Sequence, residues 1–245
     1  MLSSYFVLIA GLLSAIGNCA QPTIVYRGDT KTPKHLKDAD GFKAKGGDQS
    51  LYSHVSKGGQ DNDGYVSTSA NRAQAVSFAE KKGGGDGYVY EISANKQFID
   101  CAGTLKQYYD QWKVEEEFSA IGGIEWKQIK SWTVIENFQE GDTTQNPDYD
   151  VSTENEEAGG AQPQLAGFPT KGKIGKAWNK DPWKEFADCK PNDKKLRRGD
   201  CNDDNDSADG CDDVCKPKKS NKDFIKEYLD SIKKRGLRFA RAYFS

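Results

Sequence analysis

The chain has 245 residues, a formal net charge of −2 at pH 7, 36% hydrophobic residues and 25 glycines. The slight negative charge argues against a nucleic-acid binder, which normally carries a strong excess of lysine and arginine. The length suffices for one sizeable core with appendages, and the glycine content predicts a loop-rich domain with a modest core.

An apolar segment at residues 5–17 precedes Asn18-Cys19-Ala20. The segment is too short to cross a bilayer, which takes about 20 residues. An apolar run of this length at the N-terminus is typical of a secretory signal peptide. We therefore expect residues 1–20 to be a signal peptide and the mature protein to be secreted, with no membrane span.

Secondary structure is predicted from the spacing of apolar residues and from the turn residues between them. Residues 139–164 are acidic and poor in large apolar side chains, which predicts an exposed or mobile segment. Large apolar side chains that can pack into a core occur again at residues 165–169 and 178–183. In chain order we expect a strand at 23–28, loops with one short helix at 29–63, a strand at 64–69, a helix at 70–82 capped by Ser69, strands at 88–92 and 126–135, and a long helix at 221–243.

The acidic triplet Glu115-Glu116-Glu117 runs directly into apolar sequence. In a strand, residues two apart point to the same face. Glu115 and Glu117 are therefore expected to project together into one cleft, with Glu116 pointing away. Two carboxylates on one face repel each other, so folds that keep them there usually use them for chemistry. An acidic run by itself is more often solvated surface.

Arg27 follows an apolar strand and precedes Gly28 and Asp29. A guanidinium in this place can grip a phosphate, and the adjacent glycine lets backbone N–H groups approach the ligand. The alternative is a surface salt bridge with Asp29. Likewise, Ser67 and its neighbours can either hold a nearby carboxylate or serve as an ordinary helix cap.

Four motifs occur in order: Tyr26-Arg27-Gly28-Asp29, Leu51-Tyr52-Ser53-His54, Gly64-Tyr65-Val66-Ser67-Thr68-Ser69, and Glu115-Glu116-Glu117-Phe118-Ser119-Ala120-Ile121-Gly122-Gly123-Ile124. Together they resemble the catalytic chain of cholera toxin and the heat-labile enterotoxins, and the resemblance covers nearly all of residues 22–243. It implies an α+β ADP-ribosyltransferase fold with a mixed or antiparallel β core, flanking helices and a long C-terminal helix.

Members of that family transfer ADP-ribose from NAD to an arginine side chain of a target protein. The resemblance therefore implies NAD as a substrate, no metal, and a host target such as a heterotrimeric G-protein alpha subunit. Cleavage of the nicotinamide–ribose bond passes through an oxocarbenium-like state, as glycoside hydrolysis does.

By resemblance, Glu117 holds the ribose 2′-hydroxyl and stabilises the developing cation, while Glu115 orients the incoming guanidinium and removes its proton. Ser67 is expected to brace Glu117. His54 is expected beside the nicotinamide end of the cleft, although a lone histidine is more often structural. The residues assigned to NAD binding are Arg27, Gly28, Asp29, Thr30 and His54.

Removing the predicted signal peptide leaves five cysteines. A secreted protein favours disulfide pairing, and the odd count leaves one free thiol. A zinc site is the weaker alternative, because Cys211 and Cys215 have no nearby histidine. Sequence proximity predicts Cys189–Cys201 and Cys211–Cys215, with Cys101 free.

The chain is expected to divide into a signal peptide (1–20), a catalytic domain (21–189), a loop with an acidic linker (190–219) and a C-terminal helix (220–245). Arg197-Arg198 is a candidate protease site, and the alternative is an uncut surface loop. A nick would leave a fragment tethered by one disulfide, which the reducing cytosol of a host cell would release. The terminal helix could dock a carrier subunit or pack on the catalytic domain.

Two other functions stay open. An NAD glycohydrolase, or a transferase acting on another acceptor such as a nucleobase, would use the same residues. An inactive secreted binding protein would use the same scaffold through its C-terminal helix, but intact Arg27, Glu115 and Glu117 argue against it. A serine or zinc hydrolase is disfavoured because the sequence has only two histidines and lacks the corresponding motifs.

Overall fold

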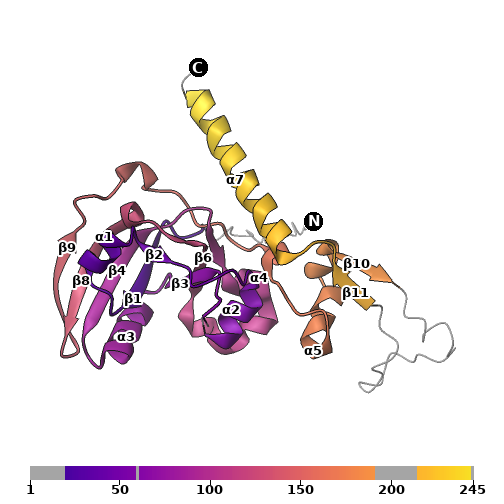
Figure 1. The fold of residues 1–245 in the computed structure, drawn as a ribbon, viewed down its shortest axis with the longest axis horizontal. Coiled ribbons are helices and arrows are strands. Elements are labelled where there is room, and N and C mark those ends of the chain that lie inside the picture. Colours follow the sequence, from indigo (N-terminus) through magenta and orange to yellow (C-terminus); the bar gives the residue numbers. More distant parts are fainter. Residues whose placement is uncertain (1–19, 59–60, 191–213, 244–245) are drawn as a thin grey trace, which may run out of the picture.

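The computed structural model describes residues 20–58, 61–190 and 214–243. Residues 1–19 of the predicted signal peptide, the Arg197-Arg198 pair, Cys201 and Cys211 lie outside the described residues. Figure 1 shows a body built around a sheet, from which the long terminal helix α7 (Asn221–Tyr243) extends.

A seven-stranded antiparallel sheet forms the centre of the body, in the order β5-β6-β3-β1-β4-β8-β9. β1 pairs with β4 over its whole length and with β3 through Tyr26 opposite Ser69. Arg27 on β1 is therefore separated from Glu117 on β6 only by β3. The strands are β1 (Ile24–Asp29), β3 (Tyr65–Ser69), β4 (Gly87–Ser93), β5 (Phe98–Asp100), β6 (Glu117–Ile121), β8 (Ile129–Glu136) and β9 (Gln139–Gln145).

Two further pairs of strands are small and antiparallel. They are β2 (Phe42–Lys43) with β7 (Gly123–Ile124), and β10 (Ala187–Lys190) with β11 (Val214–Pro217). The fold is α+β, as predicted. The remaining helices are α1 (Pro33–Asp38), α2 (Leu51–Lys57), α3 (Arg72–Gly83), α4 (Cys101–Leu105) and α5 (Gly172–Gly175), with 3₁₀ turns η1 (Lys106–Glu115), η2 (Trp126–Gln128), η3 (Val151–Thr153), η4 (Pro163–Leu165), η5 (Lys176–Asn179) and η6 (Trp183–Phe186).

Helix α3 packs directly on β1. A Cβ atom at Gly28 would lie 2.0 Å from the carbonyl oxygen of Ala75 and 2.6 Å from the amide nitrogen of Ala79, so only glycine permits this approach. The helix begins later than predicted because Asn71, not Ser69, is its N-cap and accepts the Ala73 N–H.

The segments at residues 165–169 and 178–183 contribute to the core, as predicted. Phe168 packs edge-on against Trp178 and Trp183, and both indoles are fully buried. The N-terminal part of α7 packs against the same core through Phe224, Ile225 and Tyr228. The apolar face predicted for the terminal helix therefore contacts the body in this part of its length.

One prediction about irregular segments is wrong, because residues 29–63 contain two short helices, α1 and α2, instead of one. Residues 139–164 were expected to be exposed or mobile, and the side chains of β9 are indeed all exposed. The pairing of β9 with β8 was not predicted. The backbone hydrogen bonds of an edge strand need no apolar side chains, so the polar composition of these residues gave no signal for a strand.

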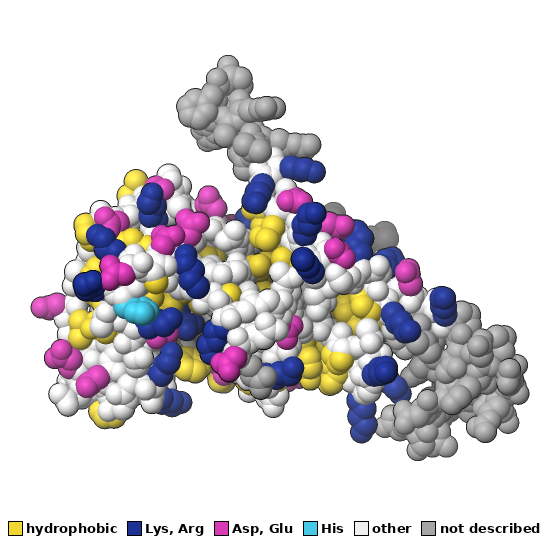
Figure 2. Space-filling view, in the orientation of Figure 1, with side chains coloured by type: hydrophobic (Ala, Val, Ile, Leu, Met, Phe, Trp, Pro, Cys, Tyr) yellow, Lys and Arg dark blue, Asp and Glu magenta, His cyan; other side chains and the backbone are white. Residues whose placement is uncertain are grey.

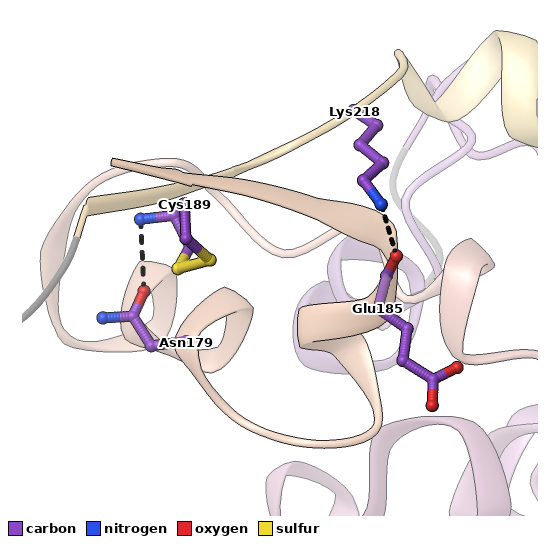
Figure 3. Close-up of a disulfide and its surroundings, with 5 residues drawn as sticks. Asn179, Glu185, Cys189 and Lys218 are labelled. Atoms are coloured by element: carbon purple, nitrogen blue, oxygen red, sulfur yellow. Dashed lines mark hydrogen bonds between the residues drawn. A yellow bond between two sulfur atoms is a disulfide. The ribbon is translucent and has the colours of Figure 1, made fainter. Parts of the chain in front are cut away.

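The predicted pairing of Cys189 is also wrong. Cys189 lies opposite Cys215 in the β10–β11 ladder, with their Cα atoms 4.0 Å apart, and the two form a disulfide (Figure 3). Strand register, not proximity in sequence, selects the partner. Beside the disulfide, the Cys215 N–H donates to Asn179 Oδ1. Cys101 is free and buried, as predicted.

Charged side chains of both signs are interspersed over the face of the molecule shown in Figure 2. Within the described residues, every helix is either too short or too polar to span a bilayer.

Candidate active site

One cleft of about 530 Å³ collects most of the predicted site residues. It lies where β1, β3, α2, α3 and η1 meet. Asp29 and Thr30, which were predicted to bind NAD, are not among the residues that line it. The predicted residues that do line it are Arg27, Gly28, His54, Ser67, Glu115 and Glu117.

Glu115 and Glu117 reach this cleft from different elements. Glu115 is the last residue of η1, Glu116 adopts the left-handed conformation with φ 43°, and Glu117 begins β6. The two acids therefore share a cleft, but the predicted reason, a common strand, is wrong. The exposed Glu116 side chain contacts Asn71 at 3.5 Å, so the turn separates it from its neighbours.

Glu117 is buried and tightly held. Its Oε1 atom lies 2.9 Å from His54 Nε2 and accepts a 2.9 Å hydrogen bond from the Ser119 hydroxyl. Its backbone N–H donates to the Tyr109 hydroxyl. Burial alone would raise the pKa of Glu117, but His54 and the Ser67 and Ser119 hydroxyls hold that pKa below its ordinary value. Glu117 is thus an ionised carboxylate at neutral pH.

His54 joins two carboxylates. Its Nδ1 atom lies 2.6 Å from Asp63 Oδ2, on the side away from Glu117. Burial alone would lower the pKa of His54, but Asp63 and Glu117 raise it to about 9. The Ser67 hydroxyl lies 3.1 Å from His54 Nε2, so Ser67 contacts the histidine as well as influencing Glu117.

Glu115 has the opposite electrostatic setting. Burial and the nearby Glu117 carboxylate raise the pKa of Glu115, although His54 and Lys81 oppose the shift. A carboxylate whose pKa is raised is a better proton acceptor near neutral pH. Ser69 fixes the backbone here, because its hydroxyl donates to the Glu115 carbonyl oxygen at 2.6 Å.

The cationic side of the cleft is built around Arg27. One terminal nitrogen, Nη1, donates to the Ser67 carbonyl at 2.6 Å, and Nη2 pairs with Asp29 Oδ2 at 2.9 Å. The guanidinium carbon also lies 4.9 Å from the centre of the Phe42 ring, and Nε has no hydrogen-bond partner among the described residues. Lys82 Nζ adds a second cation, 3.2 Å from Asp29 Oδ1.

Asp29 and Thr30 support Arg27 from behind the cleft. Burial would raise the pKa of Asp29, but Arg27 and Lys82 lower it, so the carboxylate stays ionised. The Thr30 backbone N–H donates to Asp29 Oδ1 at 2.8 Å. Their geometry is that of groups that orient the guanidinium.

Several residues of the site were not predicted. Asp63 and Ser119 contact the central pair His54 and Glu117, but nothing in their local sequence distinguishes them from turn and strand residues. Ser119 lies two positions after Glu117 on the same face of β6, which is a usable signal once the strand is known. Further residues that line the cleft are Phe78, Lys81, Lys82 and Trp112.

Groups of three or more His, Cys, Asp or Glu side chains that could hold a metal ion do not occur within the described ranges. The polar side chains that the cleft offers to a ligand are carboxylates, hydroxyls, one imidazole and several cations.

Comparisons with known proteins find relatives that match most of the chain. The model of the heat-labile enterotoxin alpha chain family matches residues 2–236. The A chain of Escherichia coli heat-labile enterotoxin IIA is 31% identical over 201 residues, which is 72% of this chain and 75% of that protein. A cholera enterotoxin chain of Vibrio cholerae is 27% identical over 189 residues, covering 66% of this chain and 69% of that one.

A further Vibrio cholerae relative, the NAD(+)–arginine ADP-ribosyltransferase Chelt, is 28% identical over 66% of this chain but only 30% of its own length. Among solved structures, an E. coli heat-labile enterotoxin mutant matches with a TM-score of 0.57 at 27% identity, over 66% of this chain and 96% of that one. A heat-labile enterotoxin double mutant matches with a TM-score of 0.61 at 22% identity, over 90% and 96% of the two chains, which shows the shared fold.

The predicted ADP-ribosyltransferase fold is thereby confirmed. The chain belongs to the heat-labile enterotoxin alpha chain family.

Proposed function

We propose that this protein is a secreted toxin that transfers ADP-ribose from NAD to an arginine side chain of a host protein and releases nicotinamide. The observation that carries the proposal is the cleft itself. It places two glutamates with opposite pKa shifts near one arginine. The relative named as an NAD(+)–arginine ADP-ribosyltransferase supports this assignment.

The first step is cleavage of the bond between nicotinamide and ribose. The ribose acquires positive charge as nicotinamide leaves, as in glycoside hydrolysis. Glu117 is ionised and held in place by His54 and Ser119, so it can stabilise this cation without moving and can accept a hydrogen bond from the ribose 2′-hydroxyl. Water or an acceptor then attacks the ribose carbon that nicotinamide has left.

The second step needs a base for the acceptor. A guanidinium must lose a proton before its nitrogen can attack, and Glu115 is the less acidic of the two carboxylates. Glu115 can also orient the guanidinium by charge attraction. In this proposal Glu115 acts on the acceptor and Glu117 acts on the donor.

NAD carries a pyrophosphate, so a site for it requires cations. Arg27 supplies one, and Lys82 lines the same cleft. Gly28 lines the wall beside Arg27, while Asp29 and the Thr30 backbone hold the guanidinium in position. His54 reaches the cleft through the nitrogen that contacts Glu117.

The deciding experiment gives the purified mature protein labelled NAD with agmatine, a small guanidinium acceptor. Glu115→Gln should abolish transfer to agmatine and retain NAD cleavage, whereas Glu117→Ala should abolish both. If Glu117→Ala leaves both activities intact, the proposal is wrong. NAD cleavage with no transfer to any guanidinium acceptor would instead indicate a glycohydrolase or a different acceptor.

The same proposal gives the rest of the chain a role in delivery. It treats residues 21–189 as the catalytic domain and residues 190–219 as a linker with a protease site at Arg197-Arg198. A cut there would leave two fragments joined by the Cys189–Cys215 disulfide. Trypsin followed by a reductant should then separate two fragments on a denaturing gel, and trypsin alone should not separate them under non-reducing conditions.

The terminal helix is the proposed docking element for a carrier subunit. Its first turns pack on the body, while the rest of α7 extends away from it in Figure 1. In this arrangement a carrier could bind the helix without covering the cleft. The host target, for which one candidate is the alpha subunit of a heterotrimeric G protein, would be sought by labelling a host lysate.

A further inference from the structure

His54 presents both ring nitrogens to carboxylates. Nδ1 lies 2.6 Å from Asp63 Oδ2 and Nε2 lies 2.9 Å from Glu117 Oε1, and all three side chains are buried. An ionised carboxylate only accepts hydrogen bonds. With both carboxylates ionised, both nitrogens carry a proton, which makes His54 an imidazolium between two anions.

Asp63 is fixed independently of His54. Its Oδ1 atom accepts the Tyr65 N–H at 3.0 Å, and its backbone carbonyl accepts the Gly46 N–H at 2.8 Å. The residue is 7% exposed and borders a second cavity, of about 400 Å³, on the side of His54 away from the cleft. Asp63 thus holds His54 from behind and has no place among the residues that line the cleft itself.

The charges of the three groups explain what Asp63 contributes. With His54 protonated and both acids ionised, the array carries one net negative charge, and its open end is Glu117. Without the Asp63 charge, a protonated His54 would neutralise Glu117. A neutral His54 would leave Glu117 buried without a cation, which favours its protonation. Either change weakens the stabilisation of a cationic ribose.

We propose that Asp63 is a positioning residue that keeps His54 doubly protonated, so that His54 holds Glu117 ionised at the cleft. This inference rests on the proposed ADP-ribosyltransferase function. Asp63 acts through His54 and touches no substrate. Asp63, His54 and Glu117 therefore act as one unit. Removing the Asp63 carboxylate reduces the ability of Glu117 to stabilise a cationic ribose in the cleft.

Other charged and titratable groups also surround His54. The Tyr65 ring lies beside the imidazole, with the ring centres 5.4 Å apart. Asp48, Lys57 and Asp61 share the second cavity with His54, and Arg27, Lys81, Lys82 and Glu115 share the cleft with it. Among the charged side chains of the described structure, the ones that contact the ring nitrogens of His54 are Asp63 and Glu117.

The test is an NMR titration of the imidazoles, because the chain has only two histidines, His35 and His54. In the unchanged protein, His54 should show two protonated nitrogens at pH 7.5 and should titrate near pH 9. Asp63→Asn should lower the pKa of His54 by about two units, to about 7, and leave the His35 signal unchanged. The matched control is Asp61→Asn, which removes an exposed carboxylate from the same cavity and should not shift His54.

NAD cleavage provides the second readout. If the pKa of His54 falls from 9 to about 7, its protonated fraction at pH 8 falls about tenfold. For Asp63→Asn, kcat should therefore fall about tenfold at pH 8 and leave KM for NAD within about twofold. It should recover only in part toward pH 6, where His54 is protonated again but the Asp63 charge is still missing.

A neutral His54 at pH 7.5 in the unchanged protein would overturn the proposal, whether or not Asp63→Asn folds. So would an equal effect of Asp61→Asn and Asp63→Asn. If the unchanged protein cleaves no NAD, the proposed function fails, while the titration still decides whether Asp63 keeps His54 protonated.

Discussion

The Ser69 hydroxyl on β3 donates a 2.6 Å hydrogen bond to the carbonyl oxygen of Glu115, the last residue of η1. The same hydroxyl accepts the N–H of Asn71, the N-cap of α3. One side chain therefore joins the sheet, the start of α3 and the turn that carries Glu115. Because Glu116 follows in the left-handed conformation, the placement of Glu115 relative to Glu117 depends on this link.

Replacing Ser69 with alanine should disturb Glu115 more than Glu117. Glu117 keeps its contacts with His54 and Ser119, whereas the Glu115 carbonyl loses its partner. We expect transfer to agmatine to fall about tenfold while NAD hydrolysis stays within about twofold, since small displacements of a positioned group are costly. The loss of stability should be about 1 kcal/mol. Ser69→Thr, which keeps the hydroxyl, is the control, and a parallel loss of both activities would contradict this prediction.

Gly28 should tolerate no side chain. A Cβ there would lie 2.0 Å from the Ala75 carbonyl oxygen on α3, so Gly28→Ala must push the helix off β1. Overpacking against backbone should destabilise the fold by about 3 kcal/mol or more. Urea unfolding measures this loss. Gly47→Ala is the matched control because no atom lies within 4 Å of its added methyl, and a similar loss there would refute the packing argument.

The pH dependence of transfer should follow Glu115. Its pKa is raised above 4.5, so the protonated form persists to higher pH than for an ordinary glutamate. A protonated Glu115 cannot accept a proton from the acceptor, and transfer should therefore fall as the pH drops through this raised pKa. Rates with agmatine from pH 4.5 to 8 measure the effect. NAD hydrolysis by Glu115→Gln should lack this acid limb, and an identical limb would assign it to another group.

The parts of the fold that depend on local periodicity were predictable. The strand at residues 23–28 and the helix at 221–243 agree with β1 and α7 because each has a continuous apolar pattern. The strand β9 was missed because its stability comes from pairing with β8 and its side chains are all exposed. Composition therefore predicted the buried elements better than the edge of the sheet.

The sequence predicted which residues line the site but not their geometry. The motif resemblance led to Arg27, His54, Glu115 and Glu117, which line one cleft. It could not supply Asp63, because the sequence motifs do not include this residue and its 2.6 Å contact with His54 Nδ1 exists only in the folded chain. Similarly, the predicted strand geometry of the two glutamates was wrong although they share the cleft, because a left-handed turn replaces the expected extended backbone.

The Cys189–Cys215 disulfide should be a major source of stability for the chain beyond the cleft. It joins β10 to β11 and closes a segment with a sequence separation of 26. Restricting a loop of this length in the unfolded chain corresponds to about 3.5 kcal/mol at 25 °C. The Cys189→Ser, Cys215→Ser double variant should lose about this much free energy of unfolding in urea, with Cys101→Ala as a thiol control that breaks no disulfide.

Proteolytic mapping without reduction should recover a peptide pair containing Cys189 and Cys215. Recovery of Cys189 linked to Cys201 instead would contradict the strand register, because residue 189 faces residue 215 across the ladder.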